Sequence, residues 1–276
     1  MTQTQTTKSS TKNNSSKTKK AASSSSSPSP PALPVGRFCW LALRTPDVKK
    51  SQAFYGDVVG WTLSVKDLGG ASFETFAGSE APVCHVEVHK GPAAFLSYVV
   101  VDDVDAAARR VTAAGGRVLG SVQRLPGVGA MLEVQDGDGA VCSLFQPASV
   151  EAAQVSKAPG GLLWSELWAK DERAAVAFLT AVCGYVVDVS AMPDGPYHVL
   201  RHGEEMQAGV MKSPDPSSSS AWVPYLHVVD VDAARRRALA AGATALGDLQ
   251  EVPGIGRTAA LLDPQGARFA LLQPAA

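Results

Sequence analysis

The sequence predicts an α+β protein of two tandem domains, each made of paired βαβββ units that form a half-open barrel, with a disordered tail at the N-terminus. Three sequence blocks recur in the same order in the two halves of the 276-residue chain. Within each half, a strand, a helix and three strands follow one another twice. The predicted boundaries are 1–35 for the tail, 36–147 for domain 1, 148–159 for a linker and 160–274 for domain 2.

The recurring blocks indicate an internal duplication. They are 38–61 with 162–185, 101–116 with 228–243, and 136–147 with 263–274. The first pair is offset by 124 residues and the other two by 127, so the second copy has three additional residues in between. Because three blocks keep one order, two copies of one domain are predicted.

The first half of each copy is predicted to be a strand, a helix and three strands. In copy one, alternating residues predict a strand over 38–44. Thr45 and Pro46 suit the N-cap and first turn of a helix, which Gly60 ends. Strand-like runs follow at 61–66, 71–77 and 82–88. The helix carries apolar or small residues at helical spacing: Val48, Ser51, Phe54, Tyr55, Val58 and Val59.

The second half of each copy repeats this order. The strand FLSYVVV precedes a helix that Asp102 or Asp103 can cap and that ends at Gly115 and Gly116. In copy two, Asp230 is the expected cap and Gly242 the expected stop. The last strands of domain 1 are expected near 117–123, 130–135 and 140–146. If helices cover one face of each sheet, the other faces surround a concave, mostly apolar cleft for a small ligand.

The charge distribution argues against a nucleic-acid groove. Residues 1–34 hold five lysines and no acidic residue, which leaves −6 for the rest of a chain whose net charge is −1. Duplex binding needs clustered positive charge. We therefore expect no nucleic-acid partner.

The tail and the cysteines bear on localisation. The Ser/Thr/Lys/Pro-rich tail has too few apolar residues to fold and lacks the apolar core of a secretory signal. No window approaches the ~18 apolar residues of a membrane span, so a cytoplasmic protein without a membrane partner is expected. The cysteines show no C-x-x-C pair and are expected as buried thiols: Cys39, Cys84, Cys142 and Cys183.

The duplicated blocks resemble a known family. TPDVKKSQAFYGDVVGW, VVVDDVDAAARRVTAAGG and LPGVGAMLEVQDGDGAVCSLFQP, with their second copies, are similar to the vicinal-oxygen-chelate superfamily. It comprises glyoxalases, bleomycin-resistance proteins, fosfomycin-resistance enzymes and extradiol dioxygenases. The resemblance covers about 36–147 and 160–274 and implies half-open barrels.

The resemblance also implies where a divalent metal would lie. Enzymes of this superfamily hold it with His and Glu from the first, fourth, fifth and eighth strands of a domain. The corresponding positions for strands one, five and eight are expected at Trp40, Leu96 and Ser143 in copy one, and at Trp164, Val223 and Ala270 in copy two. Apolar side chains cannot bind a metal and a lone serine binds it poorly, so no metal cofactor is expected.

One segment is an alternative metal site. His85, Glu87 and His89 alternate along one strand and so share a face, which would support a displaced divalent-metal site. The other interpretation is the solvated face of a strand, with Cys84 and the neighbouring valines buried behind it. This second interpretation is favoured because residues two apart on a strand are separated by roughly 6–7 Å.

Alternation also nominates the residues of the cleft. Copy two is the richer, and it offers Glu166 and His227 as a possible acid–base pair, if they come within hydrogen-bonding distance. A structural role for this pair is the favoured alternative. The expected ligand-binding residues are Trp40, Arg44, Tyr98, Ser143, Trp164, Trp168 and Tyr225.

Three functions follow from these residues. The leading one is metal-free binding of a small, partly apolar molecule, as in bleomycin-resistance-like proteins. The second is an enzyme of the same superfamily, such as a lyase, an isomerase or a hydroxylase-like oxidoreductase, acting through either residue set above. The third is a protein–protein interaction module. Since the duplication can supply within one chain the pairing of two domains, a monomer is expected, with a homodimer as the alternative.

Overall fold

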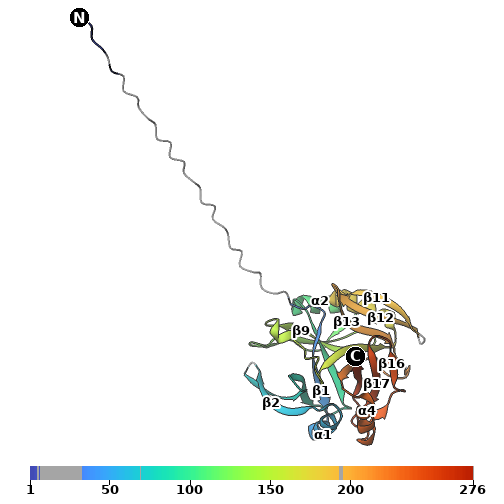
Figure 1. The fold of residues 1–276 in the computed structure, drawn as a ribbon. Helices are drawn as coiled ribbons and strands as arrows, with labels where there is room; N and C mark the ends of the chain where they lie inside the picture. Colours follow the sequence, from blue (N-terminus) through green and yellow to red (C-terminus); the bar gives the residue numbers. More distant parts are fainter. Residues whose placement is uncertain (5, 7–32, 69, 193–194, 276) are drawn as a thin grey trace. The chain divides into compact units, whose positions relative to one another are not determined.

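The structure is a computed structural model that describes residues 1–4, 6, 33–68, 70–192 and 195–275 (Figure 1). Most of the predicted tail therefore lies outside the described residues. From Leu33 onward the chain forms one compact unit that contains both copies of the repeat. The α+β tandem fold predicted from the sequence is confirmed.

Domain 1 is a single curled sheet of nine strands. Their order is β2-β3-β4-β1-β5-β9-β8-β6, with β7 beside β8. The strands are β1 (Phe38–Thr45), β2 (Thr62–Leu68), β3 (Ala71–Ala77), β4 (Pro82–Val88), β5 (Ala94–Val100), β6 (Arg117–Val118), β7 (Gln123–Leu125), β8 (Gly129–Gln135) and β9 (Val141–Pro147). The two βαβββ units join where β1 pairs with β5 in antiparallel fashion.

Domain 2 repeats this sheet strand for strand. The order is β11-β12-β13-β10-β14-β18-β17-β15, with β16 beside β17. The strands are β10 (Leu162–Ala169), β11 (Val186–Met192), β12 (Gly195–His202), β13 (Glu205–Lys212), β14 (Ala221–His227), β15 (Thr244–Ala245), β16 (Gln250–Val252), β17 (Gly256–Leu262) and β18 (Arg268–Pro274). The structural repeat is therefore complete, as the sequence blocks predicted.

Four helices cover the outer faces: α1 (Val48–Val59), α2 (Val104–Ala113), α3 (Glu172–Cys183) and α4 (Val231–Ala240). Asp103 and Asp230 cap α2 and α4 as expected, each accepting from a backbone N–H three residues on. Gly60 and Gly184 end α1 and α3 in the left-handed conformation, with φ of 75° and 73°. The residues that begin and end the helices are among the features that the sequence predicted most directly.

Two local predictions are wrong. The N-cap of α1 is Asp47, which accepts from Lys50 N, while Thr45 remains in β1 and its hydroxyl accepts from Ser51. A short carboxylate two residues further on competes successfully for the cap. The strand expected over 117–123 is two short strands, β6 and β7, because the chain turns between them at Gly120, where φ is 111°.

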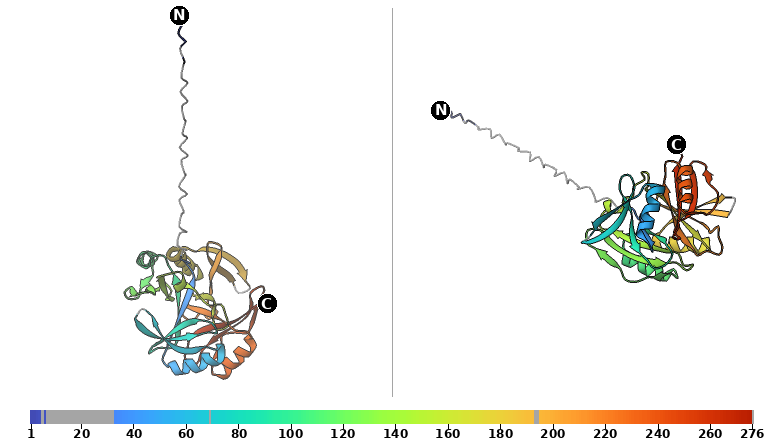
Figure 2. Two further views of the ribbon diagram at one scale, coloured as in Figure 1. Left: turned by 60° about the vertical axis from the view of Figure 1, so that its left-hand side comes forward. Right: turned by 90° about the horizontal axis from the view of Figure 1, so that it is seen from below.

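The two domains are joined by reciprocal contacts. Arg110 of α2 donates to the carbonyl of Val182 at the end of α3, and Arg237 of α4 donates to the carbonyls of Asp57 and Val58 at the end of α1. These contacts hold α1 beside α4 and α2 beside α3 (Figures 1 and 2). Basic side chains at helix C-termini satisfy the last carbonyls.

A second reciprocal pair lies deeper. Trp61 Nε1 donates to Gly160 O at 2.7 Å, and its counterpart Tyr185 donates to Gly36 O at 2.6 Å. One continuous apolar core spans both domains and includes Tyr55, which is fully buried. All four cysteines lie buried as free thiols, as expected. The two domains therefore pack against each other as one compact unit and are not independent domains joined by a linker.

The segment between the domains has a structural role that its sequence did not reveal. A short 3-10 helix, η1 (Glu151–Ala153), places the fully buried Ala153 against the inner face of domain 1. Leu33 and Val128 pack against the same cluster. This end of the domain 1 barrel is therefore filled by neighbouring segments of the chain.

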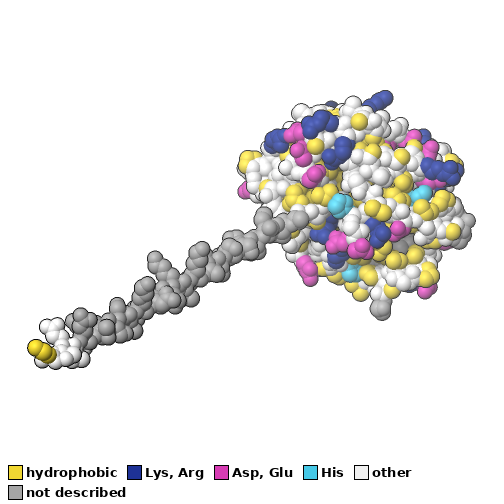
Figure 3. Space-filling view, turned by 90° about the horizontal axis from the view of Figure 1, so that it is seen from above, with side chains coloured by type: hydrophobic (Ala, Val, Ile, Leu, Met, Phe, Trp, Pro, Cys, Tyr) yellow, Lys and Arg dark blue, Asp and Glu magenta, His cyan; other side chains and the backbone are white. Residues whose placement is uncertain are grey.

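Charged side chains of both signs are interspersed on the face drawn in Figure 3, so this face carries no broad patch of one sign. No helix in the described part of the chain is both long and apolar enough to cross a membrane.

Candidate functional site

The inner faces of the two sheets carry the predicted site residues. Alternation along β1 and β10 turns three residues of each strand to the inner face, and smaller apolar clusters separate from the main core lie there. We call these surfaces inner face 1 and inner face 2. Inner face 1 includes Trp40, Ala42, Arg44, His85, Glu87, Leu96, Tyr98, Glu133 and Ser143; inner face 2 includes Trp164, Glu166, Trp168, Tyr197, Gly209, Val223, Tyr225 and Ala270.

The strand register identifies which residues lie opposite one another on inner face 1. Trp40 pairs with Tyr98, and Tyr98 pairs with Ser143, so the three form one row across β1, β5 and β9. Leu96, the expected fifth-strand position, pairs with Ala42 rather than with Trp40. The register shifts by one residue between Phe38, which pairs with Val99, and Trp40, which pairs with Tyr98.

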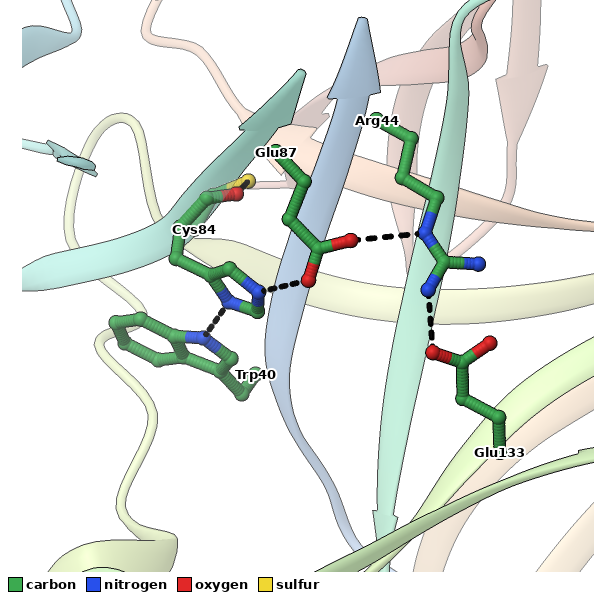
Figure 4. Close-up of polar contacts among 6 residues, drawn as sticks. Trp40, Arg44, Cys84, Glu87 and Glu133 are labelled. Carbon is green, nitrogen blue, oxygen red and sulfur yellow. Dashed lines mark hydrogen bonds and ion pairs between the residues drawn. The ribbon is translucent and has the colours of Figure 1, made fainter. Parts of the chain in front are cut away.

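A chain of polar contacts crosses inner face 1 (Figure 4). Trp40 Nε1 donates to His85 Nδ1 at 2.9 Å, so His85 Nε2 carries the proton that it donates to Glu87 Oε1 at 2.8 Å. Arg44 Nε donates to Glu87 Oε2 at 2.9 Å, and its Nη2 donates to Glu133. Arg44 is thus the cation that holds two carboxylates together.

The hydrogen bonds, ion pairs and burial of this network shift the pKa values of its side chains. The hydrogen bond from His85, helped by Arg44, lowers the pKa of Glu87 to about 2 although burial opposes the shift. Burial also opposes the charge of Arg44, but the bonds to Glu133 and Glu87 raise the pKa of its guanidinium. Burial raises the pKa of Tyr98, so its phenol keeps its proton at neutral pH. Inner face 1 therefore contains a cation that offsets one of its two carboxylate charges.

The alternative metal site at His85, Glu87 and His89 does not form. His85 is buried and committed to Trp40 and Glu87, whereas His89 lies beyond the end of β4 and is exposed. In the part of the chain that the structure describes, no three His, Cys, Asp or Glu residues are grouped to hold a metal ion. The idea of a solvated strand face is wrong as well, since His85 is buried and Val88 is 76% exposed.

Inner face 2 has the same row with different chemistry. Trp164 pairs with Tyr225, and Tyr225 pairs with Ala270, across β10, β14 and β18. Val223, the expected fifth-strand position, lies opposite Glu166 instead. Neither row fits a divalent metal, because an indole N–H only donates, a methyl group has no lone pair, and the buried phenols stay protonated.

A hydrogen-bond network surrounds Glu166, which is 5% exposed. Its Oε1 accepts from Trp168 Nε1 and from the Tyr225 hydroxyl, both at 2.7 Å. Its Oε2 accepts from the Tyr197 hydroxyl at 2.7 Å, and that hydroxyl accepts from Trp164 Nε1 at 3.1 Å. Burial, and then the neighbouring Glu166 charge, raises the pKa of Tyr197 and of Tyr225. Both phenols therefore act as donors to the carboxylate.

Gly209 makes this network sterically possible. A Cβ atom at this position would lie 2.0 Å from the Tyr197 hydroxyl and 3.1 Å from Trp164 Nε1. Gly209 pairs with Glu166 as His85 pairs with Ala42, so the two positions are equivalent in the repeat. A glycine in domain 2 thus leaves the space that an imidazole fills in domain 1.

The expected acid–base pair of Glu166 and His227 is not brought together. His227 Nδ1 contacts the carbonyl of Lys157 at 2.7 Å, and its backbone pairs with Gly160 and Gly161 at the start of domain 2. Glu166 has the separate partners described above. His227 lies at the end of β14, two pleats from the Val223 that faces Glu166, so alternation placed it on the correct face but too far along the strand.

A cavity of about 800 Å³ adjoins inner face 2 at Trp164. Its wall comes from the segment before β1, the linker, the start of β10 and the turn between β12 and β13. Arg37 and Glu205 form an ion pair of 3.0 Å within this wall. Trp164 belongs both to the cavity wall and to the network around Glu166.

Several residues of these sites were missed by the sequence reasoning. Tyr197 and Gly209 lie in β12 and β13, where alternation was not used to select inward residues. Glu133 was overlooked on β8 for the same reason. Alignment of the two copies could have identified Gly209, because it aligns with a histidine. No local signal marked His198, which is buried in β12.

Comparison with known proteins agrees with this architecture. A family model described as the Glyoxalase/Bleomycin resistance protein/Dioxygenase superfamily matches residues 37–143, and a Glyoxalase-like domain model matches residues 166–272. The chain belongs to this superfamily, also called the vicinal-oxygen-chelate superfamily, and carries two glyoxalase-like domains in tandem.

Relatives of similar length support the assignment. "Putative glyoxylase CFP32" of Mycobacterium tuberculosis is 32% identical over 245 residues, covering 86% of this chain and 94% of the relative. "Anthracycline biosynthesis protein DnrV" of Streptomyces peucetius is 30% identical over 260 residues, covering 86% and 93%. Both relatives therefore span the tandem arrangement.

Solved structures show the same fold. The Mn(II)-bound glyoxalase from Novosphingobium aromaticivorans superposes with a TM-score of 0.62 at 18% identity, over 87% of this chain and 83% of that chain. The 2,3-dioxygenase LapB from Pseudomonas sp. KL28 gives a TM-score of 0.59 at 14% identity, over 87% and 93%.

Proposed function

We propose that this glyoxalase-like protein binds a small, partly apolar molecule at inner face 2, without a metal ion. The observation that carries the proposal is the set of aromatic side chains around Glu166, one of which, Trp164, also lines a cavity of about 800 Å³. Aromatic walls with a few fixed polar groups, beside a volume of this size, are typical of small-molecule sites.

The contrast with inner face 1 supports the choice of domain. There, Leu33, Val128 and Ala153 pack into the cluster, so chain segments already occupy that end of the barrel. The cluster on inner face 2 is smaller, and Trp164, Tyr197 and Tyr225 are each only partly buried. A ligand would complete the burial of these rings, at roughly 25 cal/mol per Å² of apolar surface.

The residue types support binding without a metal. The rows of both inner faces present tryptophan, tyrosine, serine and alanine where a chelated ion would need imidazole and carboxylate. The Streptomyces relative is named for anthracycline biosynthesis, which suggests fused-ring aromatic compounds as the first class of ligand to test.

The test is calorimetric titration of the full chain with two neutral aromatic probes, an anthracycline aglycone and 2-phenylethanol, before and after treatment with a chelator. We expect saturable binding that the chelator leaves unchanged and that Trp164→Ala weakens at least tenfold. Trp40→Ala, at the equivalent position of inner face 1, is the matched control and should leave binding within twofold.

Three results would contradict the proposal. One is the absence of saturable binding by either probe. Another is binding that disappears with a stoichiometric metal ion. The third is an obligate dimer in solution with Trp164 buried at its interface, which would favour the protein–protein interaction module.

A further inference from the structure

The Glu166 carboxylate is buried without a cationic partner. Its three hydrogen-bond donors are an indole and two phenols, all neutral. Among the residues that the structure describes, no lysine, arginine or histidine forms an ion pair with it. Taking a carboxylate out of water costs several kcal/mol unless a counter-charge or enough hydrogen bonds compensate it.

In domain 1, a cationic side chain compensates the charge of the carboxylates on the inner face. Its carboxylates, Glu87 and Glu133, lie on either side of Arg44, which bonds to both. At the position equivalent to Arg44, domain 2 has Trp168, which donates one neutral N–H to Glu166. Domain 2 therefore has an aromatic ring at the position of the cation, and a buried carboxylate, Glu166, at the position of Ala42.

The arrangement leaves one acceptor position open. A carboxylate has about four lone-pair sites, and Oε1 of Glu166 accepts two bonds while Oε2 accepts one. The unused site is therefore on Oε2, the oxygen that faces Tyr197. Tyr197 is in turn bonded to Trp164, which lines the cavity. Oε2 is thus the oxygen of Glu166 that is linked to the cavity wall, through Tyr197 and Trp164.

The surrounding rings suit a cation. Tyr197 and Tyr225 donate to the carboxylate, Trp164 donates to Tyr197, and all three rings are partly accessible. The faces of such rings attract ammonium groups by about 0.5–2 kcal/mol each, and aromatic cages of this type recognise organic cations. The cavity wall itself holds two basic and two acidic side chains, Arg37, Lys157, Glu204 and Glu205. Selection by charge would therefore come from Glu166.

We propose that inner face 2 recognises an organic cation: a molecule whose apolar part lies against Trp164 in the cavity and whose ammonium group donates to Oε2 of Glu166. This inference rests on the proposed function and adds the charge of the ligand to it. The ammonium group supplies the counter-charge that Arg44 supplies in domain 1.

The test uses three probes that share a phenyl ring on a two-carbon chain: 2-phenylethylammonium, 2-phenylethanol and 3-phenylpropanoate. The affinity of each for the wild-type full chain is measured by calorimetry at pH 7. We expect 2-phenylethylammonium to bind at least tenfold more tightly than the alcohol, and the carboxylate to bind most weakly. This comparison needs no variant, so it does not depend on a substituted chain folding.

Glu166→Gln then identifies the residue. We expect it to reduce the preference for 2-phenylethylammonium over 2-phenylethanol from at least tenfold to within twofold, whatever its effect on the affinity of the alcohol. Glu87→Gln, a carboxylate of inner face 1, is the matched control and should keep the preference. Circular dichroism melting verifies that each variant is folded. Tyr197→Phe, which retains the ring but loses the donor to Oε2, should keep at least part of the preference.

The outcomes separate the two proposals. If the alcohol binds and the ammonium compound binds no more tightly, the cation inference is overturned and the proposed function stands. The cation inference is overturned in the same way if Glu166→Gln keeps the full preference. If no probe binds, the proposed function fails and the inference fails with it.

Discussion

The two inner faces share one arrangement of strands but compensate their carboxylate charges with different side chains. On inner face 1, Trp40 donates to the buried His85, and an uninterrupted chain of contacts continues through Glu87 and Arg44 to Glu133. On inner face 2, the equivalent Trp164 donates to Tyr197, and the chain ends at a carboxylate held only by neutral donors. The first network contains a cation, whereas among the described residues the carboxylate of the second has no ion-pair partner.

The difference comes from few substitutions. Ala42 corresponds to Glu166, Arg44 to Trp168, and His85 to Gly209. These exchanges change the charge and the free space on the inner face. In domain 2 a carboxylate is present, the arginine is absent, and the glycine leaves room for the Tyr197 hydroxyl. A duplicated domain can thus keep its core and redirect one copy toward a ligand, because the inner face is a separate cluster from the shared core.

The largest expected effect concerns the balance of charge. Arg44→Met leaves Glu87 and Glu133 facing each other without their cation, which should lower the free energy of unfolding by about 3 kcal/mol at pH 7. Glu166→Gln removes a charge that has no ion-pair partner and should change it by no more than about 1 kcal/mol. Urea unfolding followed by circular dichroism measures both. Equal losses for the two variants would contradict the contrast between the faces.

The next effect concerns space. Gly209→Ala places a Cβ against the Tyr197 hydroxyl, and relief of this overlap should cost about 2 kcal/mol and separate Tyr197 from Trp164. Gly137→Ala is the control, since a Cβ there meets no atom within 4 Å, and it should leave stability unchanged. Thermal melting is the measurement, and a Gly209→Ala protein as stable as wild type would show that inner face 2 is loosely packed.

A smaller effect is expected in acid. The pKa of Glu87 is about 2 in the folded protein against a reference of 4.5, so its charged form stabilises the fold above pH 4.5. This contribution is lost as the pH falls from about 4.5 through about 2. The full shift would correspond to about 3 kcal/mol, but the side chain is 39% exposed, and solvent screening should reduce it to about 1 kcal/mol. The contribution of Glu87 is the difference in the free energy of unfolding between wild type and Glu87→Gln, measured at several pH values. A difference that stays constant from pH 7 to pH 2 would contradict the prediction.

The smallest effects test the symmetry of the interface rather than the difference between the faces. Arg110→Ala and Arg237→Ala each remove a donor to the last carbonyls of a helix in the other domain. We expect losses of about 1 kcal/mol or less for each variant, equal within about 0.5 kcal/mol. Differential scanning calorimetry should show one transition in both. A separate transition for one domain would show that the two domains unfold independently.

Much of the fold could be predicted because local chemistry encodes it. The caps Asp103 and Asp230, the stops Gly60 and Gly184, and the alternation of β1 and β10 all act within a few residues. The cap of α1 was misplaced at Thr45 because two nearby residues could serve, and only the geometry of the entering chain selects Asp47. The same limit explains the split of the strand expected over 117–123.

The candidate sites were predicted only in part. Alternation correctly placed Trp40, Tyr98, Trp164 and Tyr225 on inner faces, but their rows depend on pairing between strands far apart in sequence. The register shift after Phe38, for example, puts Tyr98 rather than Ser97 opposite Trp40. Two of the three donors to Glu166 come from other strands, β12 and β14, and could not be read from its neighbours in the chain.

The sequence by itself determined the duplication, the order of the βαβββ units and the inner-face residues of β1, β5, β10 and β14. These features follow from periodicity and end signals, which act along the chain. Only the tertiary structure decided which residues meet: that His227 turns to Lys157, that His89 lies apart from His85, and that Ala153 fills the end of one barrel. The physical reason is that hydrogen bonds and packing act over a few ångströms of space, while most of the residues they join here are tens of positions apart in the chain.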